Sequence, residues 1–358
     1  MTAIGALERF INLWDFERAA EAALEPMAWR YFSRGAGDER TLRENRLAFE
    51  RRRLRPRVLV DVGCRSLATS VLGRPTSWPV LVAPMAFHGL ACGDAEAATA
   101  RAAAAEGTVL CVSTMANLPL EQVRAAAPDA RQWFQLYVQR DRGVTAELVR
   151  RAAAAGYEAL VVTVDAPALG RREADLRHGF SLPGPLSPGN LAPSDAALLA
   201  GGHATPSALA AQFAASTDPS FTWGDLGWLR SLSPLPIVLK GVLHPDDARR
   251  AADEGVEAVV VSNHGGRQLD GAIAALDALP AVAAAAGDRL EVLMDGGIRR
   301  GTDVLVALAL GARAVLLGRP VLWGLAVGGE AGAARVLSLL RPRSIWRWRS
   351  PGAPRRRK

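Results

Sequence analysis

The hydrophobic pattern alternates along most of the chain between short β-branched apolar runs and longer alanine-rich stretches. The apolar runs have the length and composition of strands covered on both faces, and the alanine-rich stretches between them are typical of helices. Repeated strand–helix units of this kind predict a parallel sheet. We expect eight strands, at Pro79–Pro84, Thr108–Ser113, Gln132–Val138, Ala159–Asp165, Leu235–Lys240, Val256–Ser262, Leu290–Asp295 and Ala314–Leu317.

Eight such units favour an α/β fold closed into a (β/α)₈ TIM barrel, in which the site lies at the carboxyl ends of the strands. A doubly wound open sheet is the alternative, but no GxGxxG follows the first strand, as a dinucleotide-binding version would require. A helical segment, Leu7–Glu50, precedes the barrel, and a long Gly/Pro/Ser/Ala-rich loop, Arg177–Thr222, follows the fourth strand. We expect one domain over residues 1–340.

Most of the excess positive charge lies at the end of the chain and not in the predicted barrel. The net charge is +7, but residues 341–358 carry eight of the positive charges and no acid, so setting this segment aside leaves −1 for the rest. A nucleic-acid reader normally carries its basic patch on the fold itself, so we expect no nucleic-acid partner. Residues 341–358 predict a disordered basic tail, produced by a shifted frame or truncated gene, or else one that binds nucleic acid or anionic lipid.

Other compositional features narrow the class of protein. No apolar run approaches the roughly 18 residues of a membrane span, and the first residues do not resemble a signal peptide, which favours a cytoplasmic location without membrane attachment. The three cysteines, Cys64, Cys92 and Cys111, are too few and too scattered for a disulfide framework, so we expect reduced thiols. No His or Cys spacing indicates a metal site.

Candidate acid/base groups follow three of the predicted strands. The run ending at Val261 delivers His264 and Arg267 into a glycine-flanked turn, Lys240 closes another apolar run, and Asp165 ends the fourth strand. Lys240 is one of only two lysines among 43 basic residues. At one barrel rim, His264 could move a proton, Asp165 could orient it, and Arg267 could hold an anion, although each alone could also be structural.

Two Gly/Arg turns, Asp295–Arg299 and Gly318–Arg319, follow the last two strands. Barrels commonly bind phosphate at this place, because glycine backbones approach the ligand closely and arginines neutralise its charge. The sequence therefore predicts a phosphorylated cofactor or substrate. Arg172 would suit capture of a carboxylate beside Arg267, and Tyr31 and Tyr137 could hydrogen-bond the same group.

Eight segments of these motifs together resemble one family, the FMN-dependent α-hydroxy-acid oxidases and dehydrogenases, such as glycolate oxidase, lactate oxidase and mandelate dehydrogenase. The likeness runs from about Met27 to about Leu340. The matching segments are Tyr31–Glu39, Ala83–Ala86, Phe134–Tyr137, Thr163–Asp165, Leu169–Glu173, Leu239–Gly241, Ser262–Gln268 and Asp295–Gly297.

The resemblance implies a set of site residues around an FMN cofactor. It implies as catalytic residues His264, Asp165, Tyr137 and Lys240. It implies as substrate-binding residues Tyr31, Tyr137, Arg172, His264, Arg267 and Met115. It implies as FMN-binding residues Pro84, Met85, Ala86, Ser113, Gln135, Thr163, Lys240, Ser262, Asp295, Gly296, Gly297, Arg299, Gly318 and Arg319.

The resemblance also implies oxidation of an L-2-hydroxy acid to the 2-oxo acid, with O₂ as acceptor and hydrogen peroxide as product, in a homo-oligomer. Ala86 matches family members that release the 2-oxo acid without decarboxylation. Met115 stands where glycolate oxidase has tryptophan, which leaves the substrate open. A dehydrogenase with a quinone or cytochrome acceptor and an impaired FMN-binding barrel with a scaffold role are the alternatives.

Overall fold

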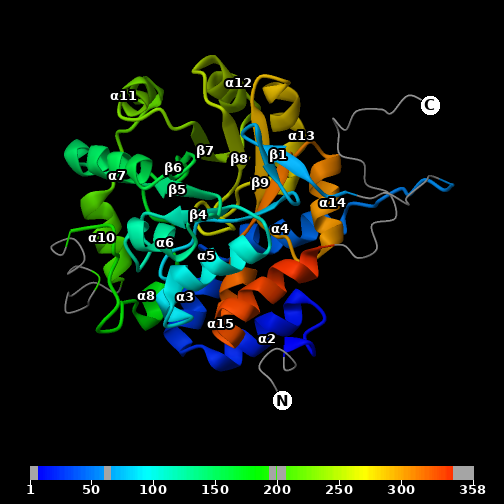
Figure 1. Ribbon diagram of the computed structural model, residues 1–358, viewed down its shortest axis with the longest axis horizontal. Coiled ribbons are helices and arrows are strands. Elements are labelled where there is room, and N and C mark those ends of the chain that lie inside the picture. Colours follow the sequence, from blue (N-terminus) through cyan, green and yellow to red (C-terminus); the bar gives the residue numbers. More distant parts are fainter. Residues whose placement is uncertain (1–6, 60–65, 193–198, 200–206, 342–358) are drawn as a thin grey trace.

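The computed structural model describes residues 7–59, 66–192, 199 and 207–341. A closed barrel of parallel strands lies at its centre with helices around it (Figure 1). The barrel strands are β3 (Val80–Val82), β4 (Leu110–Ser113), β5 (Gln132–Leu136), β6 (Leu160–Thr163), β7 (Ile237–Val242), β8 (Ala258–Val261), β9 (Glu291–Asp295) and β10 (Ala314–Leu317). Each pairs with its neighbour in chain order, and β10 closes the ring on β3. The predicted eight-stranded barrel is confirmed.

The strands agree with the predicted ranges to within two residues at either end. Their inward side chains, among them Leu81, Trp133 and Val260, form a fully buried cluster that fills the barrel. One difference concerns Lys240, which was expected to end its strand. It lies inside β7 instead, because the strand continues to Val242 through an irregularity in its pairing with β8.

Helices cover the outside of the barrel, as the alanine-rich stretches predict. They are α5 (Ala95–Ala105), α6 (Leu120–Ala126), α7 (Arg142–Ala154), α11 (Leu226–Ser231), α12 (Pro245–Asp253), α13 (Ala275–Ala286), α14 (Gly301–Ala309) and α15 (Arg319–Leu340), with the 3₁₀ turns η1 (His88–Leu90) and η2 (Trp223–Asp225). Small side chains let these helices approach the sheet closely; α5 buries seven of its eleven residues.

The N-terminal helical segment forms three helices, α2 (Leu13–Ala23), α3 (Pro26–Ser33) and α4 (Arg40–Glu50). Asn12 begins α2 with a capping box, because its side chain accepts from the backbone N–H of Asp15 and Asp15 accepts in return. The buried face of α2 packs on α15 (Figure 1). The prediction of a helical start is thus confirmed.

A hairpin of β1 (Thr69–Val71) and β2 (Arg74–Thr76) precedes the barrel and was not predicted. Its Val71 packs into the same cluster as the inward barrel side chains, so the hairpin covers one end of the barrel. The hairpin turn places both Leu72 and Gly73 at positive φ, 51° and 71°. Leucine rarely adopts that conformation, and the sequence therefore carries no ordinary hairpin signal there.

The long connection after β6 is only partly a loop. It contains α8 (Glu173–His178) and α10 (Ala208–Ser216), so the prediction of a loop over Arg177–Thr222 is wrong for the α10 segment. Ser207 begins α10 by accepting from the backbone N–H of Ala210. Residues 193–198 and 200–206 lie outside the described residues, as does the predicted tail after Arg341.

Among the described residues, no helix has the length and hydropathy needed to cross a membrane. Cys92 and Cys111 are free thiols, and burial raises the pKa of Cys111, while Cys64 lies outside the described residues. Within those same ranges, no three His, Cys, Asp or Glu side chains are grouped so that they could hold a metal ion.

Helix α15 folds back on itself at Gly328 and Gly329, and its two halves meet at Gly324 and Gly332. A Cβ on Gly324 would lie 2.5 Å from the carbonyl oxygen and 2.7 Å from the carbonyl carbon of Gly332, and backbone cannot move aside cheaply. We therefore expect Gly324→Ala to reduce the free energy of unfolding by about 1–3 kcal/mol, measured by chemical denaturation.

Gly227→Ala is the matched control, because Gly227 is also helical and a Cβ there meets no atom within 4 Å. This variant should be neutral or slightly more stable. Equal stability of Gly324→Ala and the unmodified protein would contradict the close approach of the two half-helices.

Candidate active site

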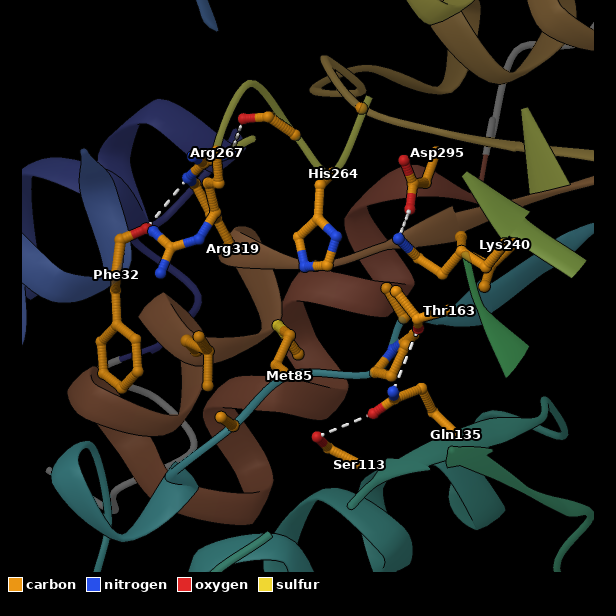
Figure 2. A pocket seen from close by; sticks show the side chains of 18 of the residues that line it. Phe32, Met85, Ser113, Gln135, Thr163, Lys240, His264, Arg267, Asp295 and Arg319 are labelled. Carbon is orange, nitrogen blue, oxygen red and sulfur yellow. Dashed lines mark hydrogen bonds and ion pairs between the residues drawn. The ribbon is translucent and has the colours of Figure 1, made fainter. Parts of the chain in front are cut away.

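A pocket of about 1100 Å³, its open mouth included, lies at the carboxyl ends of the barrel strands. The structure brings nearly all predicted site residues to its walls: Tyr31, Pro84, Met85, Ala86, Ser113, Met115, Gln135, Tyr137, Thr163, Arg172, Lys240, His264, Arg267, Asp295, Gly296, Gly297, Arg299, Gly318 and Arg319. The two others lie behind the wall, Asp165 against His264 and Ser262 against Lys240. Figure 2 shows part of this arrangement.

His264 is held in one orientation from both sides. Its Nδ1 lies 3.0 Å from Asp165 Oδ1, and its backbone N–H donates to Ser262 Oγ at 2.9 Å. The residue has φ of 58°, a left-handed conformation that non-glycine residues seldom adopt and that often marks functional sites. Gln268, which sequence reasoning missed, donates to the backbone carbonyl of Asp165 at 2.9 Å and so holds the backbone that carries this carboxylate.

The environment makes His264 a neutral base. Burial lowers the pKa of His264 below 6.5; attraction to Asp165 opposes this, while the charges of Lys240 and Arg172 reinforce it. Burial alone would raise the pKa of Asp165, but the hydrogen bond from His264 and the positive charge of Lys240 hold it below its usual value. With Asp165 ionised, Nδ1 of His264 carries the proton, and Nε2 is free to accept another.

Lys240 is a buried ammonium with fixed partners. Its Nζ lies 3.1 Å from Asp295 Oδ2 and donates to Ser262 Oγ at 3.1 Å. Burial works against the charge, but attraction to Asp295 and Asp165 raises the pKa of Lys240 above its usual range. An ammonium has three N–H groups, so one remains for a ligand. Asp295 Oδ1 is buried without a protein partner in the described part of the chain.

A row of polar side chains crosses three neighbouring strands on the same wall. Ser113 Oγ on β4 donates to Gln135 Oε1 on β5 at 3.1 Å, and Gln135 Nε2 donates to Thr163 Oγ1 at 3.0 Å (Figure 2). The three hydrogen-bonded residues form a polar edge that lies between Lys240 and Met85 in the view of Figure 2. Such an edge suits a planar ring with alternating hydrogen-bond donors and acceptors.

The pocket arginines are anchored by neutral oxygens. Arg319 donates to the carbonyls of Phe32 at 2.9 Å and Gly265 at 3.0 Å, and Arg267 donates to that of Tyr31 at 2.6 Å. Burial lowers the pKa of Arg319 to about 9 and of Arg267 to about 10, with neighbouring arginines adding to the effect. Buried cations held by neutral acceptors favour an incoming anion.

The turn after β9 brings a second anion-binding group beside Arg319. Gly296 and Gly297 have φ of 95° and 79°, and a Cβ on Gly297 would lie 2.8 Å from the carbonyl carbon of Asn45. Arg299 stacks 4.6 Å from the Trp323 ring, and burial lowers the pKa of Arg299 to about 10. Because α14 and α15 also begin here, the helix N-termini add N–H groups for a phosphate.

The opposite end of the pocket combines cations with apolar and aromatic side chains. Arg172 is 7% exposed, and its Nε and Nη1 have no protein partner among the described residues. The guanidiniums of Arg172 and Arg267 lie 5.9 and 5.0 Å from the Tyr31 ring. Burial raises the pKa of Tyr137 to about 12, which keeps its phenol a hydrogen-bond donor.

Sequence reasoning missed part of the apolar wall beside Met115. The missed side chains are Leu169, Leu209 and Phe213, and the Phe213 ring packs edge-on against Tyr137 with centroids 5.1 Å apart. Leu209 and Phe213 are four residues apart on α10, so they share one helix face. That spacing is the signal that could have identified them.

Comparison with known proteins agrees with this geometry. A family model for FMN-dependent dehydrogenases matches residues 20–343. An L-lactate oxidase of a Nostoc species is 56% identical, over 95% of this chain and 93% of its own, and human 2-hydroxyacid oxidase 1 is 46% identical, over 94% and 91%. The chain belongs to the FMN-dependent dehydrogenase family. FMN is therefore its cofactor, and the predicted family is confirmed.

Solved structures agree with the sequence comparison. A crystal structure of mandelate oxidase with (S)-4-hydroxymandelic acid superposes with a TM-score of 0.89, at 42% identity over 92% of each chain. The barrel fold is thus shared with a solved protein of clear sequence similarity.

The pocket fits FMN on the observations above. The Ser113–Gln135–Thr163 edge and Lys240 match the hydrogen-bonding side of a flavin ring, and the unpartnered Asp295 oxygen lies at the same place. The Gly297 turn with Arg299 and Arg319 matches a phosphate. These residues would hold the two ends of the cofactor.

Arg299→Met tests the phosphate assignment while keeping the apolar stem over Trp323. We expect the dissociation constant of FMN to rise about 10- to 100-fold, the value of one hydrogen bond to a charged group, and that of riboflavin, which lacks the phosphate, to stay unchanged. Flavin fluorescence titration measures both. Arg300→Met is the control, because Arg300 is exposed and stacks on Trp14; equal losses in both variants would contradict the assignment.

Proposed function

We propose that this protein oxidises an L-2-hydroxy acid to the 2-oxo acid and transfers the electrons to O₂, which leaves as hydrogen peroxide. The observation that carries the proposal is the convergence of a neutral His264, Arg172 with two unpartnered nitrogens, and Arg267, which is held only by backbone carbonyls among the described residues, on the pocket that fits FMN. Relatives named L-lactate oxidase, glycolate oxidase and 2-hydroxyacid oxidase support the same reaction class.

In this proposal, the arginine pair binds the substrate carboxylate. Arg172 offers two unpartnered N–H positions and Arg267 lies over the same tyrosine ring, so the two forks can engage both carboxylate oxygens. The phenols of Tyr31 and Tyr137 would donate to the carboxylate or the hydroxyl oxygen. Together these contacts would orient the carbon that carries the hydroxyl group.

His264 would serve as the base. Oxidising the C–OH group to C=O removes two electrons and two protons, and Nε2 of His264 accepts one of the protons. The Asp165 carboxylate stabilises the imidazolium that forms. FMN, when bound, supplies the two-electron acceptor, and Lys240 places a fixed positive charge at its ring. The balanced reaction converts the hydroxy acid and O₂ into the oxo acid and hydrogen peroxide.

The proposal also covers the electron acceptor, the catalytic competence of the protein, its location and its oligomeric state. We favour O₂ over a quinone or cytochrome acceptor because the similar proteins named above are oxidases. We favour an active enzyme over an inert scaffold because the predicted catalytic side chains lie together in the described structure. The cytoplasmic location and the homo-oligomer remain predictions.

The deciding experiment is anaerobic mixing of the purified holoprotein with glycolate, lactate, mandelate and longer 2-hydroxy acids. We expect at least one acid to bleach the flavin absorbance, and readmitted air to restore the colour with stoichiometric peroxide. His264→Ala should stay yellow but no longer bleach. Absence of bleaching by every acid would overturn the proposal, and bleaching without peroxide would favour another acceptor.

The pH dependence follows from the environment of His264. Its neutral form is the base, and burial lowers its pKa, so kcat/KM should be level at neutral pH and fall only below pH 6.5. Asp165→Asn removes the charge that raises this pKa, so the inflection should move to still lower pH while the plateau drops. Steady-state profiles of both proteins test this; an inflection above 6.5, or one that Asp165→Asn leaves in place, would be inconsistent with it.

A further inference from the structure

A buried carboxylate outside the pocket joins two loops of its wall. Glu96 lies in the first turn of α5 and is 1% exposed. Its Oε1 accepts from the backbone N–H groups of His88 at 3.1 Å and Asn117 at 3.0 Å, and its Oε2 accepts from that of Leu118 at 3.1 Å. The partners of this charge are thus backbone groups of two different loops.

Both loops carry pocket residues. The loop after β3 contributes Pro84–Ala86 before it reaches His88, and the loop after β4 contributes Met115 before it reaches Asn117. Two direct hydrogen bonds also join the loops: the N–H of Phe87 donates to the carbonyl of Met115 at 3.3 Å, and the N–H of Gly89 donates to Asn117 Oδ1 at 2.8 Å. Glu96 is therefore the charged link between the wall that would face the flavin and the wall that would face the substrate.

Hydrogen bonds near Glu96 connect the two loops to each other and to α5. Asn117 Oδ1 accepts from the N–H of Gly89 at 2.8 Å, and His88 Nδ1 lies 2.8 Å from Thr99 Oγ1, one turn after Glu96 on α5. Phe87 has φ of 61°, a conformation that persists only where its surroundings enforce it. The loop after β3 is thus strained and held to α5 at two points.

We propose that Glu96 is a positioning residue that sets the spacing between Pro84–Ala86 and Met115. The inference rests on the proposed function for the identity of the substrate wall. An acceptor that is ionised and buried makes strong hydrogen bonds to N–H groups, and their loss leaves those donors unpaired. Without Glu96 the two loops would separate, loosening the flavin side and widening the space beside Met115.

Two substitutions of Glu96 remove different numbers of its hydrogen bonds to the two loops. Glu96→Gln keeps one oxygen that can accept from His88 and Asn117 but turns its amide toward the N–H of Leu118, whereas Glu96→Ala removes all three acceptor contacts. Glu106→Ala is the matched control, because Glu106 follows the opposite end of α5 and pairs with Arg341 at 3.1 Å, away from the pocket.

The first measurement is FMN release from the holoprotein, followed by flavin fluorescence after dilution. We expect release about tenfold faster in Glu96→Ala, an intermediate rate in Glu96→Gln and no change in Glu106→Ala. The second is the ratio of kcat/KM for lactate to that for mandelate, which a wider space should shift toward mandelate. A variant that is merely less stable would lose activity on both acids in proportion.

The outcomes separate the two proposals. If the unmodified protein oxidises no hydroxy acid, the proposed function fails, and the FMN release rates alone decide the role of Glu96. If it does oxidise them, but Glu96→Gln and Glu96→Ala match Glu106→Ala in release rate and substrate ratio, only the role of Glu96 is overturned. Should Glu96→Ala fail to fold, Glu96→Gln decides by the same two measurements.

Discussion

The site depends on a cluster of buried positive charge at one end of the barrel. The cations are Lys240, Arg172, Arg267, Arg299 and Arg319. Asp165 and Asp295 attract Lys240, and the carboxylates Glu17, Asp175 and Asp303 attract the arginines. Burying these cations is costly, because the loss of hydration outweighs the attraction of the nearby carboxylates and lowers the pKa values of Arg299 and Arg319. In the proposed function, anionic ligands would relieve that cost at both ends of the pocket, a phosphate at one and a carboxylate at the other.

The same charge distribution governs the base. A positive environment and exclusion of water both disfavour imidazolium, so His264 is neutral before substrate binds. Asp165 opposes this only in part, and it lies on the Nδ1 side, away from Nε2, the atom that would accept the proton in the proposed reaction. In the proposed function, the same buried positive charges would therefore both attract the anionic ligands and keep His264 neutral, so that it can accept a proton.

Much of this was predictable because barrel strands and their carboxyl ends leave local patterns. The β-branched runs gave the strands to within two residues, and His264, Lys240 and Arg299 follow or lie near such ends. What lacked a local pattern was missed. The β1–β2 turn has Leu72 at positive φ, where a turn normally has glycine or asparagine. Glu96 lies within an alanine-rich helix, where a carboxylate is normally expected to be exposed to solvent.

The arginines also show why the N-terminal helices belong to the site. Helix α3 ends beside the pocket, and its last carbonyls, which have no partner within the helix, accept from Arg267 and Arg319. Carboxylates in those places would hold the guanidiniums equally well but would cancel their charge. Neutral carbonyls fix the geometry and leave the full charge for the ligand. An element outside the barrel thus orders Arg267 and Arg319, and within the described part of the chain neither forms an ion pair.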